Sequence, residues 1–191
     1  MDFNVCSHNW SAEMKNIMSE INMNVNFDDQ SCINLELASK ELSMINFNKW
    51  KGDLNSSPKL RTYKLFKNSF SPEPYVYLFN RRQRSLIAQI RAGILPLHIE
   101  TGRFMCIPVE LRLCMFCDDN VCETEIHFLF ECLLYSEIRQ NFYREIAAVF
   151  PDFVNLDNEE KIKYIWGEHV IKFTAIFCEE AMSKRRRCLY S

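Results

Sequence analysis

The sequence predicts a mostly α fold: a helical domain with a small zinc-binding knuckle of the Cys-Cys-His-Cys type inserted between helices. Two observations predict it. Apolar residues recur at three- and four-residue steps in several segments, whereas the alternation typical of strands is scarce. Cysteines and a histidine gather between residues 114 and 132 with the spacing of a metal site. We therefore expect helices that each bury one apolar face, interrupted by a metal-binding segment at residues 106–135.

Composition limits the functions open to the chain. Its 191 residues are 48% apolar and 25% charged, which is typical of one globular domain with or without a small appendage. The four glycines are scattered singly, so no glycine-rich phosphate loop is present. No nucleophile signature accompanies any of the four histidines, and we expect neither enzymatic activity nor a small-molecule substrate.

Cysteine usage and hydropathy bear on location. The first residues do not read as a signal peptide, and no apolar run is long enough to span a membrane. Nine cysteines, an odd number, then favour free thiols or metal ligands over disulfides. We expect an intracellular protein, in the nucleus or cytoplasm, without a membrane partner.

Residues 1–44 are weakly characterised. Met14, Ile17, Met18 and Ile21 are spaced as on a helix that Ser11 could cap, and a second helix is expected from Ile33 to Met44. Asn55-Ser56-Ser57-Pro58 reads as a linker.

Residues 45–105 form a basic helical region. Residues 59–91 contain eight basic side chains and one acidic one, although the whole chain has a net charge of −2. Arg84 to Leu95 is expected to be a helix, ended by Gly93 and Pro96. Bases interleaved with aromatic residues suit RNA or DNA, because the cations neutralise phosphates and the rings stack on bases. The candidates are Lys59, Arg61, Lys64, Lys67, Arg81, Arg82, Arg84 and Arg91. A solvated face, with Tyr63, Phe66 and Phe70 in the core, explains the pattern equally well.

The cysteine cluster is the most specific motif. Cys114 and Cys117, with two residues between them, are followed by Cys122, His127 and Cys132. Thiolate and imidazole are ligands that Zn²⁺ prefers, and four of them would close a tetrahedral structural site. Cys122 could replace one of the four. His127 and Cys132 lie five residues apart and would not share a face of a regular α-helix, so the helix must loosen near Cys132 or the ligand set differs. The alternative is that these residues are ordinary core side chains.

Residues 136–191 are predicted to form the C-terminal helices. One helix runs from Leu134 to Val149 and ends before Pro151. Asp157 and Glu160 have the spacing of a capping box that opens another helix, which Gly167 bends or splits. The basic tail, Lys184 to Arg187, suits nuclear import, phosphate binding or the negative end of a helix dipole.

Residues 45–191 resemble the zinc-binding region at the C-terminal end of LINE-type retrotransposon reverse transcriptases. The resemblance rests on Arg112-Leu113-Cys114-Met115-Phe116-Cys117 and on residues 123–135, with upstream stretches at residues 59–67 and 95–103. It implies that Cys114, Cys117, His127 and Cys132 hold Zn²⁺ and that Cys122 is a bystander. It also implies that the basic region adjoins RNA and target DNA. One departure is Leu133, where the family commonly has proline.

The resemblance does not extend to the polymerase palm, whose catalytic aspartates are absent from this sequence. We therefore expect a zinc-stabilised nucleic-acid-binding module without polymerase activity of its own. Two alternatives stay open at this point. One is a protein-interaction module in which the zinc is purely structural and the acidic residues 92–183 form the contact surface. The other is a retroelement fragment without a function.

Overall fold

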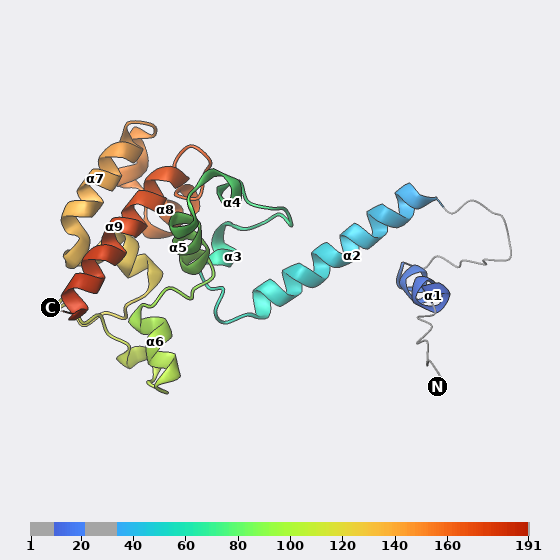
Figure 1. The fold of residues 1–191 in the computed structure, drawn as a ribbon, viewed down its shortest axis with the longest axis horizontal. Helices are drawn as coiled ribbons and strands as arrows, with labels where there is room; N and C mark the ends of the chain where they lie inside the picture. Colours follow the sequence, from blue (N-terminus) through green and yellow to red (C-terminus); the bar gives the residue numbers. More distant parts are fainter. Residues whose placement is uncertain (1–9, 22–33, 191) are drawn as a thin grey trace, which may run out of the picture. The chain divides into compact units, whose positions relative to one another are not determined.

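The computed structural model describes residues 10–21 and 34–190 (Figure 1). The chain divides into two compact units, residues 1–54 and residues 55–191, which are described separately below. Helices account for most of the described residues. In the same ranges the β-structure is one isolated antiparallel bridge, between Leu113 and Cys122. The prediction of a mostly α fold is therefore confirmed.

The first unit contains α1 (Trp10–Glu20) and all but the last two residues of α2 (Leu35–Ser56). Met18, Ile21 and Ala38 form a small apolar cluster between them. Helix α2 begins after Asn34, whose side-chain oxygen accepts a hydrogen bond from Leu37 N at 3.0 Å, as an N-cap does. The helix is twelve residues longer at its C-terminal end than the predicted Ile33–Met44, so the expected boundary between residues 44 and 45 lies inside it.

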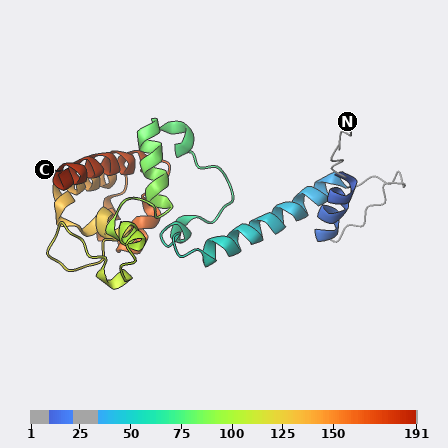
Figure 2. The same ribbon diagram turned by 60° about the horizontal axis from the view of Figure 1, so that its bottom comes forward.

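The second unit holds the remaining helices, which are all short except α9. They are α3 (Tyr63–Phe66), α4 (Tyr75–Leu78), α5 (Arg81–Arg91), α6 (His98–Phe104), η1 (Val109–Leu111), η2 (His127–Glu131), η3 (Leu133–Tyr135), α7 (Ser136–Ala147), η4 (Pro151–Asn155), α8 (Asn158–Tyr164) and α9 (Ile171–Tyr190). Helix α9 packs against both α5 and α7 (Figure 1; Figure 2). Its inner face is apolar and includes Ala175, Phe177 and Ala181.

Aromatic rings fill the core where α7 and α9 meet the segment that contains η2. The Phe177 ring lies 5.0 Å from the Phe142 ring and 5.7 Å from the Phe128 ring, measured between centroids. These are contact distances for aromatic pairs, and Phe128 and Phe177 are almost fully buried. Residues 106–135 therefore contribute their own side chains to the main core.

Helix boundaries follow local capping. Asn80 caps α5 by accepting a hydrogen bond from Gln83 N at 2.9 Å, so the helix begins three residues before the predicted Arg84. Past its end Gly93 adopts φ +67°, and a Cβ there would lie 2.3 Å from the Lys59 carbonyl oxygen, so glycine is required. The predicted capping box of Asp157 and Glu160 is present at α8. The expected helix beyond it is split near Gly167 into α8 and α9.

Candidate metal centre

A tight turn presents the first two cysteines. The backbone pairs across it, with Cys114 N donating to Val121 O at 2.8 Å and Glu123 N donating to Arg112 O at 2.9 Å. Asn120 completes the turn in the left-handed region, at φ 50°, which asparagine tolerates better than most residues. Cys114 and Cys117 are thereby held within one short loop.

A π-helical turn presents the other two ligands. Residues His127–Glu131 form η2, which Cys132 N closes by donating to His127 O, five residues back, at 2.8 Å. Cys132 itself leaves the helix with φ −51° and ψ 126°. The wider turn brings His127 and Cys132 to the same side, which a regular α-helix would not do. The expectation that the helix loosens near Cys132 is confirmed.

Four side chains converge at this place. The ligand atoms of Cys114, Cys117, His127 and Cys132 all lie within 4.8 Å of one another. Cys114 Sγ is 3.7 Å from Cys132 Sγ, and Cys117 Sγ is 3.4 Å from His127 Nε2. The four could hold one metal ion between them. Cys122 lies outside the group, and its thiol contacts the Val109 carbonyl oxygen at 3.5 Å.

The thiols are protonated at neutral pH as long as no metal is bound. Burial raises the pKa of the Cys114 and Cys132 thiols, and it raises the pKa of Cys117 to about 11. A cation that displaces these protons would replace buried S–H groups by metal–thiolate bonds. Metal binding at this centre should therefore release protons and become stronger as the pH rises.

A second contact sets the orientation of the imidazole. His127 Nδ1 lies 3.3 Å from a Glu131 carboxylate oxygen, while Nε2 faces Cys117. The other Glu131 oxygen accepts a hydrogen bond from Asn158 Nδ2 at 2.7 Å. With its proton on Nδ1, the ring would offer the Nε2 lone pair to a metal, and the carboxylate holds the ring in that orientation.

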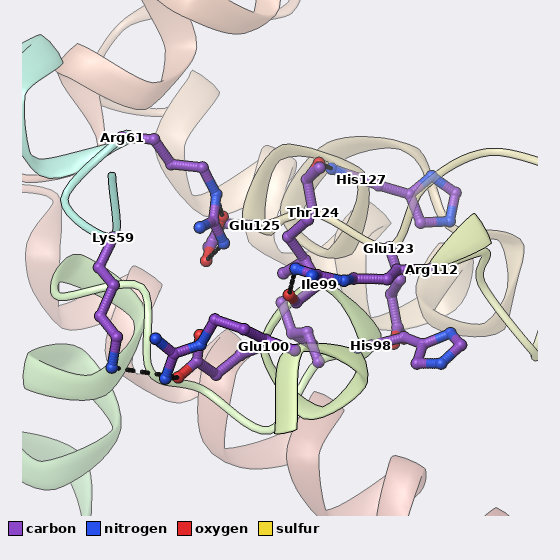
Figure 3. A network of polar contacts seen from close by, with 12 residues as sticks. Lys59, Arg61, His98, Ile99, Glu100, Arg112, Glu123, Thr124, Glu125 and His127 are labelled. Atoms are coloured by element: carbon purple, nitrogen blue, oxygen red, sulfur yellow. Dashed lines mark hydrogen bonds and ion pairs between the residues drawn. The ribbon is translucent and has the colours of Figure 1, made fainter. Parts of the chain in front are cut away.

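Buried acidic residues tie the centre to the surrounding helices. Glu123, which is 1% exposed, accepts a hydrogen bond from His98 N at 2.6 Å (Figure 3). It also accepts hydrogen bonds from both terminal nitrogens of Arg185, the Nη2 bond measuring 2.9 Å. Its carboxylate also lies 3.9 Å from Cys114 Sγ. Glu123 therefore connects a ligand residue to the start of α6 and to α9.

Glu125, a second buried acidic residue, connects the centre to the segment that precedes α3. Arg61 binds it in a bidentate manner, at 2.5 and 3.1 Å, and Lys59 lies 3.4 Å from Glu100 (Figure 3). Burial raises the pKa of the Glu125 carboxyl group, and the Arg61 guanidinium opposes that shift. Lys59 and Arg61, the first two of the eight candidate cations, are thus engaged with buried carboxylates.

The eight cations that the sequence suggested for nucleic acid do not lie on one surface. Lys67 and Arg91 are buried, and both form ion pairs with Glu73. Arg91 also sits among four aromatic rings, 4.5 to 5.5 Å from their centroids. Neither side chain is available to a phosphate, and their assignment to a nucleic-acid surface is corrected accordingly. The exposed members of the set are Lys64, Arg81, Arg82 and Arg84.

The four residues of the basic tail, Lys184 to Arg187, also differ in exposure and in their ion pairs. Arg185 is 3% exposed and faces Glu123, and Lys184 lies 3.7 Å from Glu137. Arg186 and Arg187 are exposed. Because α9 packs on α5, these two arginines belong to the same unit of structure as the exposed arginines at the start of α5.

Sequence reasoning missed the residues that support the centre. Arg139 is buried and donates to Leu129 O at 2.9 Å and to Cys132 O at 2.8 Å, which holds the end of the π turn. Glu123 and Glu125 were also missed. Two acidic residues that lie four and two positions before a candidate ligand histidine, next to an apolar run, are the signal that could have identified them.

No family model, curated protein or solved structure matches the chain. Within the part of the chain that the structure describes, none of the helices combines the length and the apolar character needed to cross a membrane.

Proposed function

We propose that this chain is a zinc-stabilised module that binds RNA or DNA, resembling the C-terminal part of a LINE-type reverse transcriptase without polymerase activity of its own. The convergence of Cys114, Cys117, His127 and Cys132 supports the metal part of the proposal. The packing of α5 against α9, which joins two basic segments that lie about one hundred residues apart, supports the nucleic-acid part.

The spacing of the ligand atoms favours zinc. A tetrahedral ion with bonds of roughly 2.3 Å to sulfur and 2.0–2.1 Å to nitrogen implies separations of about 3.8 Å between sulfurs and about 3.5 Å between sulfur and nitrogen. The corresponding distances are 3.7 and 3.4 Å. Three thiolates and one imidazole also suit zinc better than a hard cation. Four protein ligands leave no position for a reactive water, so the proposed role is structural.

Five exposed arginines make up the proposed nucleic-acid surface. Arg81, Arg82 and Arg84 occupy the first turn of α5, and Arg186 and Arg187 lie near the end of α9. Arg82 bridges the two helices, since its guanidinium donates to Ser183 Oγ at 2.8 Å and lies 3.3 Å from a Glu179 oxygen. A surface that carries this many exposed arginines would bind phosphates by releasing their counterions.

The metal assignment is tested by the zinc content of purified variants. Cys114→Ser and Cys132→Ser should lose the metal, whereas Cys122→Ser, the matched control, should retain one zinc per chain. Loss of zinc in Cys122→Ser together with retention in His127→Ala would show that the ligand set is wrong. Metal-free protein in which residues 106–135 exchange their amide hydrogens as slowly as in the zinc-loaded protein would overturn the zinc proposal itself.

The nucleic-acid proposal is tested by the salt dependence of binding. The zinc-loaded chain should bind oligonucleotides at low salt, and the affinity should fall as salt rises. The double variant Arg81→Gln/Arg186→Gln should lower the slope of log K against log salt by about 1.5, because two phosphate contacts are lost. Lys163→Gln/Lys172→Gln removes two exposed charges elsewhere and should leave the slope nearly unchanged. No binding of RNA or DNA even at low salt would refute the proposal, and the protein-interaction alternative would then lead.

A further inference from the structure

A groove of about 660 Å³ runs between α5 and the last turns of α9. One face of each helix lines it, because the lining residues alternate between steps of one and three positions along both helices. Its apolar part includes Leu86, Met182 and Leu189, and its polar part includes Arg81, Arg82 and Arg186. The volume falls in the range of roughly 300–1,000 Å³ that is usual for ligand sites.

The charge of the groove has one sign. Four arginines and no acidic residue are found among the described residues that line it. The fourth, Arg185, is neutralised from behind by Glu123, and Arg82 is paired with Glu179. Arg81 and Arg186 are exposed at the two walls. The rim therefore offers cations on both sides of an apolar floor, which is complementary to a ligand that carries anionic groups at intervals.

One aromatic and one aliphatic side chain at the end of α9 add an exposed apolar surface, which phosphate binding does not require. Tyr190 is 87% exposed and Leu189 is 44% exposed, and both line the groove. An exposed phenol ring beside arginines is the arrangement on which unpaired bases stack. A duplex would not use it, because the faces of paired bases are covered by their neighbours in the stack.

We propose that the groove between α5 and α9 is a seat for single-stranded nucleic acid, in which Arg81 and Arg186 contact phosphates while one or two unpaired bases pack on Tyr190, Leu189 and Leu86. This inference rests on the proposed function, and adds to it the strandedness of the ligand and the place where the bases lie. Ser85 and Gln89, on the same wall of α5, place a hydroxyl and an amide within the groove for contacts with base edges.

The experiment measures the affinity of the zinc-loaded full chain for labelled oligonucleotides of roughly 12 nucleotides, within the site sizes usual for such grooves. Single-stranded RNA, single-stranded DNA and the duplex of each are compared by fluorescence anisotropy at one low salt concentration. The single strands should bind more tightly than the duplexes. A difference between the two single strands identifies which sugar the groove prefers, and either preference supports the proposal.

The decisive variant removes the apolar surface and keeps every charge. Leu189→Ser/Tyr190→Ala should weaken single-strand binding by at least about fivefold, as expected for the loss of one stacked base, without changing the salt slope. Tyr77→Ala/Leu78→Ser is the matched control, because it removes an exposed aromatic and an exposed aliphatic side chain on α4, outside the groove, and should bind as the wild type does.

The outcomes separate this inference from the proposed function. Equal binding of single strands and duplexes, unaffected by Leu189→Ser/Tyr190→Ala, would overturn the groove while leaving a cationic nucleic-acid surface. Failure to bind any oligonucleotide at low salt would overturn both. The probe for a protein ligand is an anionic amphipathic helical peptide. If the binding of this peptide depends on Leu189 and Tyr190 while oligonucleotide binding does not, the groove binds protein. This result would also overturn the proposal.

Discussion

At the scale of single residues, Glu123 connects the metal centre to the helices around it. Its buried carboxylate contacts the Cys114 thiol, caps the first N–H of α6 and pairs with Arg185 of α9. A buried carboxylate is stable only if its charge is balanced, and here the partner comes from a segment 62 residues away in the sequence. This ion pair fixes α9 against the metal-binding segment.

Glu123→Gln should lower the free energy of unfolding by about 3 kcal/mol, because it leaves the buried Arg185 guanidinium without a counterion. Urea unfolding of the zinc-loaded protein would measure this. Exposed Glu110→Gln, in the same segment, is the control and should change stability by less than about 0.5 kcal/mol. Adding Arg185→Met to Glu123→Gln should restore part of the loss. A stability loss for Glu110→Gln as large as for Glu123→Gln would contradict the role of the pair.

The thiol pKa values predict a difference between the metal-free and zinc-loaded proteins. In the metal-free fold, burial raises the pKa of Cys117 from 9.0 to about 11. The stability gained by keeping this proton is complete below pH 9 and is lost as the pH rises through 11. Metal-free protein should therefore become easier to unfold by urea across this window, whereas the zinc-loaded protein, whose ligands are already deprotonated, should lose less. Identical pH slopes for the two forms would speak against these thiols as ligands.

At the scale of elements, the π turn of η2 decides the geometry of the site. Its closing hydrogen bond, from Cys132 N to His127 O, is supported by Arg139, which reaches from α7 to the carbonyl groups of Leu129 and Cys132. The aligned carbonyls at the end of a helix lack partners of their own, and here a buried guanidinium supplies them. Helix α7 thus holds His127 and Cys132 in position opposite Cys114 and Cys117.

Replacing Arg139 with Met should cost about 2–3 kcal/mol of unfolding free energy, because two hydrogen bonds from a charged donor are lost inside the protein. It should also weaken zinc binding in competition with a chelator, since Cys132 is no longer held. Arg144→Met, on the exposed side of the same helix, is the control and should affect neither. If zinc affinity is the same in Arg139→Met and Arg144→Met, the π turn does not depend on this contact.

At the scale of the whole molecule, the segment with the candidate metal centre, residues 106–135, is part of the main core of residues 55–191. Cys114, Phe128, Leu129 and Cys132 belong to the same buried cluster as Ile87 of α5 and Phe177 of α9. Loss of the metal should therefore be felt beyond the loop that holds it.

Chelation should raise amide hydrogen exchange most strongly in residues 106–135, and to a smaller degree in α5, α7 and α9, which share that core. Helix α2, most of which belongs to the other compact unit, should exchange at an unchanged rate and serves as the internal control. Because structural zinc sites contribute roughly 10–16 kcal/mol of apparent binding energy near neutral pH, the effect should be large. Amide exchange rates that the chelator leaves unchanged in every part of the chain would contradict a structural metal.

Local patterns in the sequence were enough to predict several features of this protein. The helices at residues 136–147 and 158–164, the capping box at Asp157 and the break near Gly167 depend on neighbours within a few residues, and the sequence displays those neighbours directly. The ligand types follow from the chemistry of thiol and imidazole. The need for a loosened helix follows from the five-residue spacing of His127 and Cys132 alone.

The tertiary structure decided what depends on distant partners. The sequence alone left Cys122 open as a ligand, and the fold places its thiol against Val109, outside the group of four. Arg81 and Arg91 look alike in the sequence, but one is exposed and the other lies among rings from α3, α4 and the turn after α8. The cost of burying a charge depends on whether counterions and rings surround it, and those arrive only when segments far apart in the chain pack together. For the same reason the groove between α5 and α9 forms only when the two helices pack together, although local sequence patterns indicate each helix.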